Sequence, residues 1–231
     1  IIGLGNLGHG YRTVSSLFFF HSLLYLPWIK FYLFHSGPFL ILLYFNYIVI
    51  KKLLTQINSN KFNLVYFFTL FAFTFVNIAF YRISEHGTDR SAQIIIFLIF
   101  IYLLDIVVEK KEPNKINDKI NLILILLFFA SSLKAIYYIY LIIIPIFFFD
   151  LIFKKSLFIN TYKKFIFILF LIFSLNLSIN FFSTGCFLYP EKKTCFNTSW
   201  SIPIKEVELM NTHYEWWAKA GGGPNYKSEL D

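Results

Sequence analysis

The residues best suited to chemistry form a polar octet, Ser84-Glu-His-Gly-Thr-Asp-Arg-Ser91, between two long apolar runs. It contains two carboxylates, an imidazole and a guanidinium, from Glu85, Asp89, His86 and Arg90. A carboxylate can take a proton from an attacking hydroxyl, and cations can stabilise a departing phosphate. Chemistry on a phosphate-bearing lipid is one interpretation of the octet, and a solvated loop is the other. Because the stretch from His86 to Asp89 is rich in turn formers, we expect that it does not continue a helix.

The apolar composition of the chain predicts a membrane protein. Of its 231 residues, 57% are hydrophobic and 22% aromatic, far more than in an ordinary soluble domain. We therefore expect an all-α fold: a polytopic helical membrane protein with about six transmembrane helices, an interfacial helix and a small outer C-terminal tail. The sequence does not begin with Met, and we expect it to be a fragment.

The positive charge of the chain is placed as in a membrane protein, not as in a nucleic-acid-binding protein. The net charge is +8, but eleven lysines fall in three alternate connections between apolar runs: Lys51, Lys52 and Lys61; Lys110, Lys111, Lys115 and Lys119; Lys154, Lys155, Lys163 and Lys164. Short lysine-rich loops stay cytoplasmic. We therefore expect a bacterial inner membrane protein with the Asp89 octet and the tail in the periplasm, with membrane lipid as its partner and no nucleic acid.

The apolar runs predict six spans, over residues 34–50, 63–82, 92–108, 120–133, 135–153 and 165–183. Residues 14–33 are interrupted by Pro27 and Lys30, so we expect a helix in the outer interface within an outer-face segment 1–33. An ordinary pair of spans around His35 is the alternative. The membrane domain is predicted to cover residues 1–184 and the extracytoplasmic tail residues 185–231. Asp105 is expected to pair with a lysine at the inner end.

Two further segments carry candidate ligands for a phosphate. The opening Gly3-Leu-Gly-Asn-Leu-Gly8 has the spacing of a dinucleotide fingerprint, but no βαβ pattern follows and no acidic residue lies at the required distance. A flexible glycine loop carrying Asn6, His9 and Arg12 remains. The second segment is Ser131-Ser-Leu-Lys134, which interrupts an apolar block; its ammonium either binds an anion or snorkels to the headgroups.

The only two cysteines, Cys186 and Cys195, both lie in the predicted outer tail. On the oxidising side of a membrane a disulfide is the expected pairing, with two free thiols as the alternative. No Cys or His pair has the spacing of zinc ligands. No cofactor is evident, and a divalent metal is left open.

Several motifs of the chain resemble those of a group of bacterial multi-spanning proteins. They are the glycine opening through Thr13, the octet, the Ser131–Lys134 interruption and the tail motifs Gly185-Cys-Phe-Leu-Tyr-Pro190 and Trp200-Ser-Ile-Pro203. Their opening motif is similar to that of C-type membrane glycosyltransferases. The resemblance implies transfer of a sugar from a polyprenyl-phosphate-linked donor at the outer face. The resemblance also implies a key acidic residue in the first outer loop of the family, a region that would precede Ile1 here, so Asp89 does not simply inherit that role.

Our hypothesis assigns the acceptor or general-base role to Asp89, with Glu85 as the second choice and His86 assisting. The phosphate contacts are assigned to Arg12, Arg90 and Lys134, with His9 and Asn6 in the glycine loop.

Two other classes stay open. A transporter or flippase of a lipid-linked or anionic solute needs polar residues within its spans, and here they are sparse: Asn46, Asn77, Asn176, Asn180 and Lys134. It should also show paired repeats with broken helices, and we find no convincing repeat. A non-catalytic membrane assembly subunit would carry no chemistry in its loops.

Overall fold

The computed structural model describes residues 2–7, 12, 15–17, 23, 26–28, 33, 35–80, 87–108, 113–143 and 157–220. The chain divides into two compact units. Unit 1 contains Ile1–Val14 and Ile172–Asp231, and unit 2 contains Ser15–Leu171. The opening glycine segment therefore groups with the C-terminal tail. The division into a membrane domain and an outer tail at residue 184 stays a prediction.

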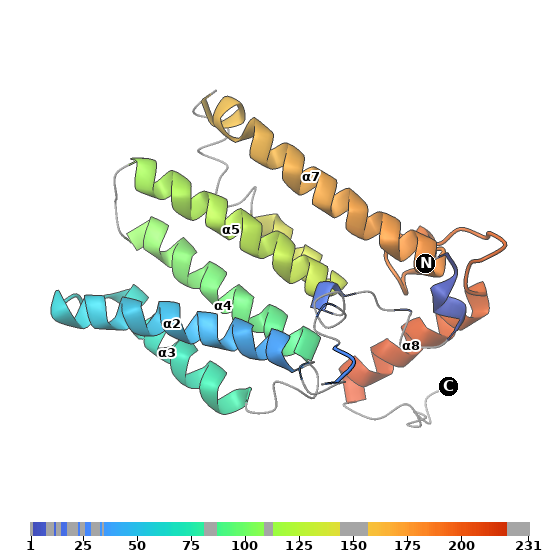
Figure 1. Ribbon diagram of the computed structural model, residues 1–231, viewed down its shortest axis with the longest axis horizontal. Helices are drawn as coiled ribbons and strands as arrows, with labels where there is room; N and C mark the ends of the chain where they lie inside the picture. Colours follow the sequence, from blue (N-terminus) through green and yellow to red (C-terminus); the bar gives the residue numbers. More distant parts are fainter. Residues whose placement is uncertain are drawn as a thin grey trace. The chain divides into compact units, whose positions relative to one another are not determined.

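The helices of unit 2 pack around α4 (Figure 1). The elements are α2 (Ser36–Asn58), α3 (Leu64–Ala79), α4 (Gly87–Val108), α5 (Pro113–Leu133) and the 3-10 helix η3 (Ala135–Ile142). Helix α4 contacts α2, α3 and α5, and η3 contacts α5. Consistent with this central place, Ile94, Ile99 and Ile101 of α4 are completely buried. The antiparallel hairpin of α4 and α5 thus forms the core of the unit.

Local sequence signals explain where these helices begin. Pro113 is the first residue of α5, a position where its missing N–H costs no helical hydrogen bond. Asn63 precedes α3, and its side chain accepts a hydrogen bond from the backbone N–H of Tyr66 at 3.1 Å. At the other end of the preceding helix, Asn60 has a φ of 51°, which turns the chain after α2.

The outer faces of unit 2 are apolar. On α3, Phe67, Phe71, Phe75 and Ile78 recur at helical spacing and are 40–70% exposed. Two helices, α2 over Ser36–Asn58 and α4 over Asp89–Val108, are long and apolar enough to cross a membrane, judged by length and composition. Among the described residues we find helices and one isolated bridge but no strand, so the all-α class is confirmed there.

Several helices continue past the predicted spans into polar sequence. Helix α2 runs to Asn58 rather than to residue 50, because Lys51 and Lys52 are good helix formers and Lys52 finds a carboxylate partner. Helix α5 begins at Pro113 and α7 (Leu157–Thr184) begins eight residues before residue 165. The predicted span 135–153 starts as a 3-10 helix, and residues 144–156 lie outside the described part. Of the interfacial helix predicted over 14–33, the structure describes only residues 15–17, 23, 26–28 and 33.

Unit 1 brings the opening glycine segment against the end of α7. Its other elements are the short 3-10 helices η1 (Leu4–Asn6) and η4 (Lys192–Thr194) and helix α8 (Ile204–Ala220). Gly5 is buried in η1, where an added Cβ would lie 2.8 Å from Ile202 and 2.9 Å from the Ser183 carbonyl oxygen. The backbone N–H of Gly3 donates to the Phe182 carbonyl at 2.8 Å. The glycines thus allow the opening segment to lie directly against the tail.

Candidate functional site

Asp89 lies in the first turn of a helix. Helix α4 begins at Gly87, so the expectation that residues 86–89 are too rich in turn formers for a helix is wrong from Gly87 onward. Turn-forming residues also begin helices, and a carboxylate in the first turn interacts favourably with the helix dipole. The side chain of Asp89 is therefore held by a long and well-packed element. Glu85 and His86, the other two predicted catalytic residues, lie outside the described part of the chain.

Asp89 forms an ion pair with Lys134. The distance from its Oδ1 to Lys134 Nζ is 2.6 Å, and the two side chains are 41% and 46% exposed. The sequence predicts that Ser131–Lys134 interrupts the apolar block. In the structure this break occurs at Lys134. It is extended, with φ −154° and ψ 129°, between the end of α5 and the start of η3. A carboxylate and an ammonium are thus brought together from segments far apart in sequence, and both remain accessible.

Tyr137 connects the same two segments through the backbone. Its hydroxyl donates to the carbonyl oxygen of Asp89 at 3.3 Å, and its ring, 8% exposed, stacks on Tyr140 at 5.8 Å. Residues three apart in a 3-10 turn lie on one side of it, so Lys134 and Tyr137 approach Asp89 together. Sequence reasoning missed Tyr137. Its position three residues after Lys134 was the only available signal.

Arg90 and Ser91 follow Asp89 with unused hydrogen-bonding capacity. The Nη1 atom of Arg90 is buried and has no hydrogen-bond partner in the part of the chain that the structure describes. The same holds for the hydroxyl of Ser91, a residue that is completely buried. Buried donors without partners are uncommon and costly. A ligand oxygen next to Arg90 would remove that cost.

Two of the predicted phosphate ligands of the glycine loop instead contact other residues of unit 1. The Nε of Arg12 donates to the Gly5 carbonyl at 3.0 Å, and its Nη2 forms an ion pair with Glu206 of α8. The side-chain amide of Asn6 donates to the Trp200 carbonyl at 2.7 Å. Both side chains therefore fasten the opening segment to the tail. The third predicted ligand of this loop, His9, is outside the described residues.

The charge of Arg12 is also coupled to Tyr189. Burial lowers the pKa of the Arg12 guanidinium, but the neighbouring Glu206 and Tyr189 side chains outweigh this effect, and the pKa ends above its usual value. Burial raises the pKa of the Tyr189 hydroxyl, and the adjacent Arg12 opposes the rise. Arg12 is thus a firmly charged group with a carboxylate partner.

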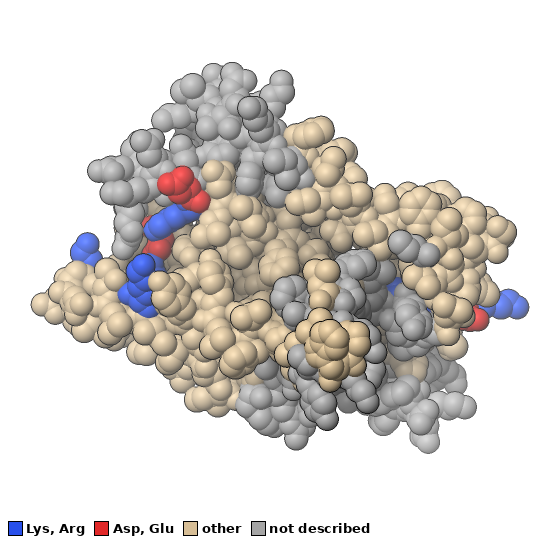
Figure 2. All heavy atoms as spheres, viewed as in Figure 1, with Lys and Arg blue, Asp and Glu red and all other residues tan. Residues whose placement is uncertain are grey.

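A second charged cluster lies at the other end of the α4 and α5 hairpin. The side chain of Asp105 is 3% exposed and forms two ion pairs. Its Oδ2 lies 2.8 Å from Lys119 Nζ, and its Oδ1 pairs with Lys52 Nζ. Figure 2 shows charged side chains gathered where α2 and α4 end and α5 begins. The expected ion pair of Asp105 is confirmed. The sequence did not indicate that lysines from two different helices share this carboxylate.

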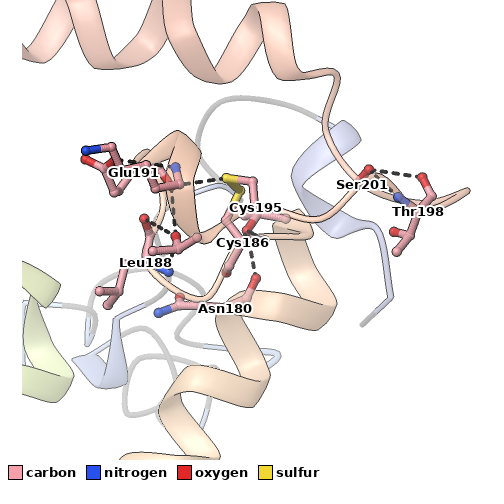
Figure 3. The surroundings of a disulfide bond; sticks show 10 residues. Asn180, Cys186, Leu188, Glu191, Cys195, Thr198 and Ser201 are labelled. Atoms are coloured by element: carbon pink, nitrogen blue, oxygen red, sulfur yellow. Dashed lines mark hydrogen bonds between the residues drawn. A yellow bond between two sulfur atoms is a disulfide. The ribbon is translucent and has the colours of Figure 1, made fainter.

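The tail is closed by a disulfide between Cys186 and Cys195, with an S–S distance of 2.05 Å (Figure 3). The backbone N–H of Phe187 donates to the Thr194 carbonyl at 3.1 Å, and that of Phe196 donates to the Gly185 carbonyl at 2.9 Å. Among the described residues, no group of three His, Cys, Asp or Glu side chains could hold a metal ion.

The comparison with known families can now be added to this geometry. The model of the family described as "Domain of unknown function (DUF8201)" matches residues 1–226. The chain belongs to this family. The match covers both units, so the DUF8201 domain includes the Asp89 and Lys134 pair as well as the disulfide-closed tail. No curated protein and no solved structure matches the chain significantly.

Proposed function

We propose that the chain is a polytopic membrane protein that transfers a sugar from a polyprenyl-phosphate-linked donor, with its site at Asp89 and Lys134. The observation that carries the proposal is the 2.6 Å pair of a half-exposed carboxylate and a half-exposed ammonium at the start of α4. The residue that follows Asp89, Arg90, has a buried Nη1 without a hydrogen-bond partner among the described residues. Accessible groups of both signs at one point are what transfer from a phosphate leaving group requires.

The membrane location is supported by the apolar faces of the helices. The two long apolar helices α2 and α4, the shorter apolar helices 64–79 and 170–184, and the exposed phenylalanines of α3 fit a lipid environment. In the proposed topology six segments cross a bacterial inner membrane. The Asp89 site and the tail face the periplasm, whereas Asp105 lies at the cytoplasmic end among the lysine-rich loops.

In the proposed reaction, Asp89 takes the proton of the acceptor hydroxyl while the acceptor oxygen bonds to the anomeric carbon of the sugar. The bond from this carbon to the phosphate oxygen breaks, and the polyprenyl phosphate leaves with the electron pair. Lys134 and Arg90 stabilise the negative charge that develops on the phosphate. Before the donor binds, Lys134 neutralises Asp89. Once the phosphate is bound, the ammonium is shared between the two anions.

Binding of the leaving group tests this proposal without knowledge of the sugar or the acceptor. The chain in phosphatidylcholine nanodiscs is titrated with a polyprenyl phosphate and with the matching polyprenol, which lacks the phosphate. We expect saturable binding of the phosphate only, weakened by Lys134→Gln and by Arg90→Gln but not by Lys61→Gln, a control at an exposed lysine in a connection. Equal binding of alcohol and phosphate, or wild-type affinity in both site variants, would contradict the proposal.

The transporter alternative receives less support from the same observations. Asn46 and Asn77, two of the few polar residues within the apolar helices, donate side-chain hydrogen bonds to each other at 3.0 and 2.8 Å. An amide pair of this kind joins two helices. It leaves fewer groups for a path through the unit, so transfer remains the function proposed.

A further inference from the structure

The disulfide-closed loop and the adjoining end of α7 expose several large apolar side chains. Phe182, Phe187, Leu188 and Phe196, here called the apolar patch, are 43%, 38%, 37% and 52% exposed. The rings of Phe182, Phe187 and Phe196 lie 5.8, 5.0 and 5.8 Å from the ring of Phe181. Contiguous exposed apolar surface of this kind marks a contact with another apolar phase.

The exposure of the patch is built into the backbone. Phe187 follows Cys186 and Phe196 follows Cys195, the two residues joined by the disulfide. The backbone N–H of Phe187 donates to the Thr194 carbonyl at 3.1 Å, and that of Phe196 donates to the Gly185 carbonyl at 2.9 Å. Figure 3 shows Leu188 on the same closed loop. These hydrogen bonds and the disulfide fix the backbone positions from which the rings of Phe187 and Phe196 project. The patch is therefore a preformed surface.

The patch continues the exposed apolar face of α7. Ile172, Leu175 and Phe182 lie three and seven residues apart, which places them on one side of the helix, and they are 37%, 54% and 43% exposed. Phe182 belongs both to this face and to the patch. Whatever apolar phase covers Leu175 therefore extends along α7 to the loop.

Lysines lie on the same disulfide-closed loop as Phe187 and Leu188. Lys192 and Lys193, both exposed, belong to η4, and Lys192 forms an ion pair with Glu208 of α8. Aromatic rings next to lysines at the end of an apolar helix are typical of the boundary between acyl chains and headgroups. A protein partner would not require this order of apolar helix face, aromatic rings and lysines.

We propose that the apolar patch is a membrane anchor that lies in the headgroup and acyl boundary and holds the disulfide-closed loop on the bilayer surface. The occupant of this surface is phospholipid. The inference depends on the proposed membrane location but not on the proposed sugar transfer. It gives the tail a task separate from the Asp89 site: to fix unit 1 at a defined depth.

Photocrosslinking of the full chain in phospholipid nanodiscs tests the anchor. The photoreactive analogue benzoylphenylalanine replaces Phe196 or, in a second variant, Phe187, which covers the case that one replacement disturbs folding. Leu175 on α7 is the position expected to face lipid in any case. Leu209 on α8, 63% exposed and not part of the patch, is the control. Lipid adducts are detected by mass spectrometry.

We expect lipid adducts at positions 196 and 187 with yields close to that at 175, and no adduct above background at 209. Adducts at 175 but not at 196 or 187, or protein adducts in their place, would overturn the anchor and leave the proposed membrane location standing. Absence of lipid adducts at all positions would overturn both. Equal adduct yields at 196 and 209 would also overturn the inference, because the patch would then not be a distinct contact.

Discussion

The two ends of the hairpin formed by α4 and α5 use the same pair of residue types in opposite ways. At one end Asp89 and Lys134 pair with about half of each side chain exposed. At the other end Asp105 is buried, with lysines from α2 and α5 on its two oxygens. The carboxylates lie about 24 Å apart along the helix, at a rise of about 1.5 Å per residue. The buried cluster joins three helices, whereas the accessible pair can exchange partners.

Burial, and not residue type, distinguishes the ion pair that holds helices together from the pair that can exchange partners. A lysine buried on a carboxylate cannot leave it without exposing an unpaired charge to a medium of low dielectric constant. An exposed pair contributes little to stability and can separate at small cost. The predictions below test this contrast, from the largest expected effect to the smallest.

Replacement of Asp105 should have the largest effect on stability. Asp105→Ala removes the carboxylate from between two ammonium groups, and loss of one partner from a buried ion pair costs about 3–5 kcal/mol. Thermal or denaturant unfolding in detergent measures the change. Asp118→Asn, at an exposed position of α5, is the control. A loss no larger than that of the control would mean that the cluster does not hold the three helices.

Opening the disulfide should come next. Its cysteines are nine residues apart in sequence, and closing a loop of this size contributes about 2.5–3 kcal/mol in the chain-entropy description. We expect a reductant to lower the unfolding temperature of the wild type. The double variant Cys186→Ser/Cys195→Ser should show the same decrease without a reductant. The reductant should leave the double variant unchanged. An unchanged wild type would show that the loop is held without the bond.

Loss of the Tyr137 hydroxyl should have a moderate effect. Tyr137→Phe removes one hydrogen bond to the Asp89 carbonyl, which is worth about 0.5–1.5 kcal/mol. The matched control is Tyr140→Phe, since Tyr140 contributes ring contacts and makes no described hydrogen bond through its hydroxyl. Unfolding of both variants, measured under the same conditions, gives the difference. Equal losses would assign the effect to ring packing and remove Tyr137 from the site.

Ionisation of Tyr189 should make the stability of unit 1 depend on pH in the alkaline range. Because its pKa is raised above the usual value of about 10, the folded state holds the phenolic proton more tightly than the unfolded state does. Stability is therefore complete below about pH 10 and falls as the pH rises through the folded-state pKa. Tyr189→Phe should flatten this alkaline loss. An identical alkaline profile in the variant would contradict the assignment.

The smallest effect on stability is expected at Asp89. Asp89→Asn should change the free energy of unfolding by about 0–1 kcal/mol, because the pair with Lys134 is half exposed. The contrast with Asp105→Ala, measured in the same unfolding experiment, is the direct test of the comparison between the two ends. Equal losses at both positions would remove the distinction.

Sequence reasoning predicted the helical class, the break at Lys134 and the ion pair of Asp105, because each depends on local composition or on charge next to an apolar run. It placed α4 too late, since the turn formers before Asp89 begin a helix instead of interrupting one. It did not predict that Arg12 forms an ion pair with Glu206, or that Tyr137 contacts Asp89. These contacts join residues distant along the chain, and the only signal for either was the position of Tyr137, three residues after Lys134.

Sugar transfer by the Asp89→Asn variant tests the central claim most directly. Membranes containing the folded variant are supplied with a polyprenyl-phosphate sugar, and released polyprenyl phosphate is measured beside wild type and Asp118→Asn. The account predicts loss of release in Asp89→Asn, with polyprenyl phosphate binding and thermal stability near those of wild type, and full release in Asp118→Asn. Release at the wild-type rate in folded Asp89→Asn would contradict the role of Asp89 as the proton acceptor.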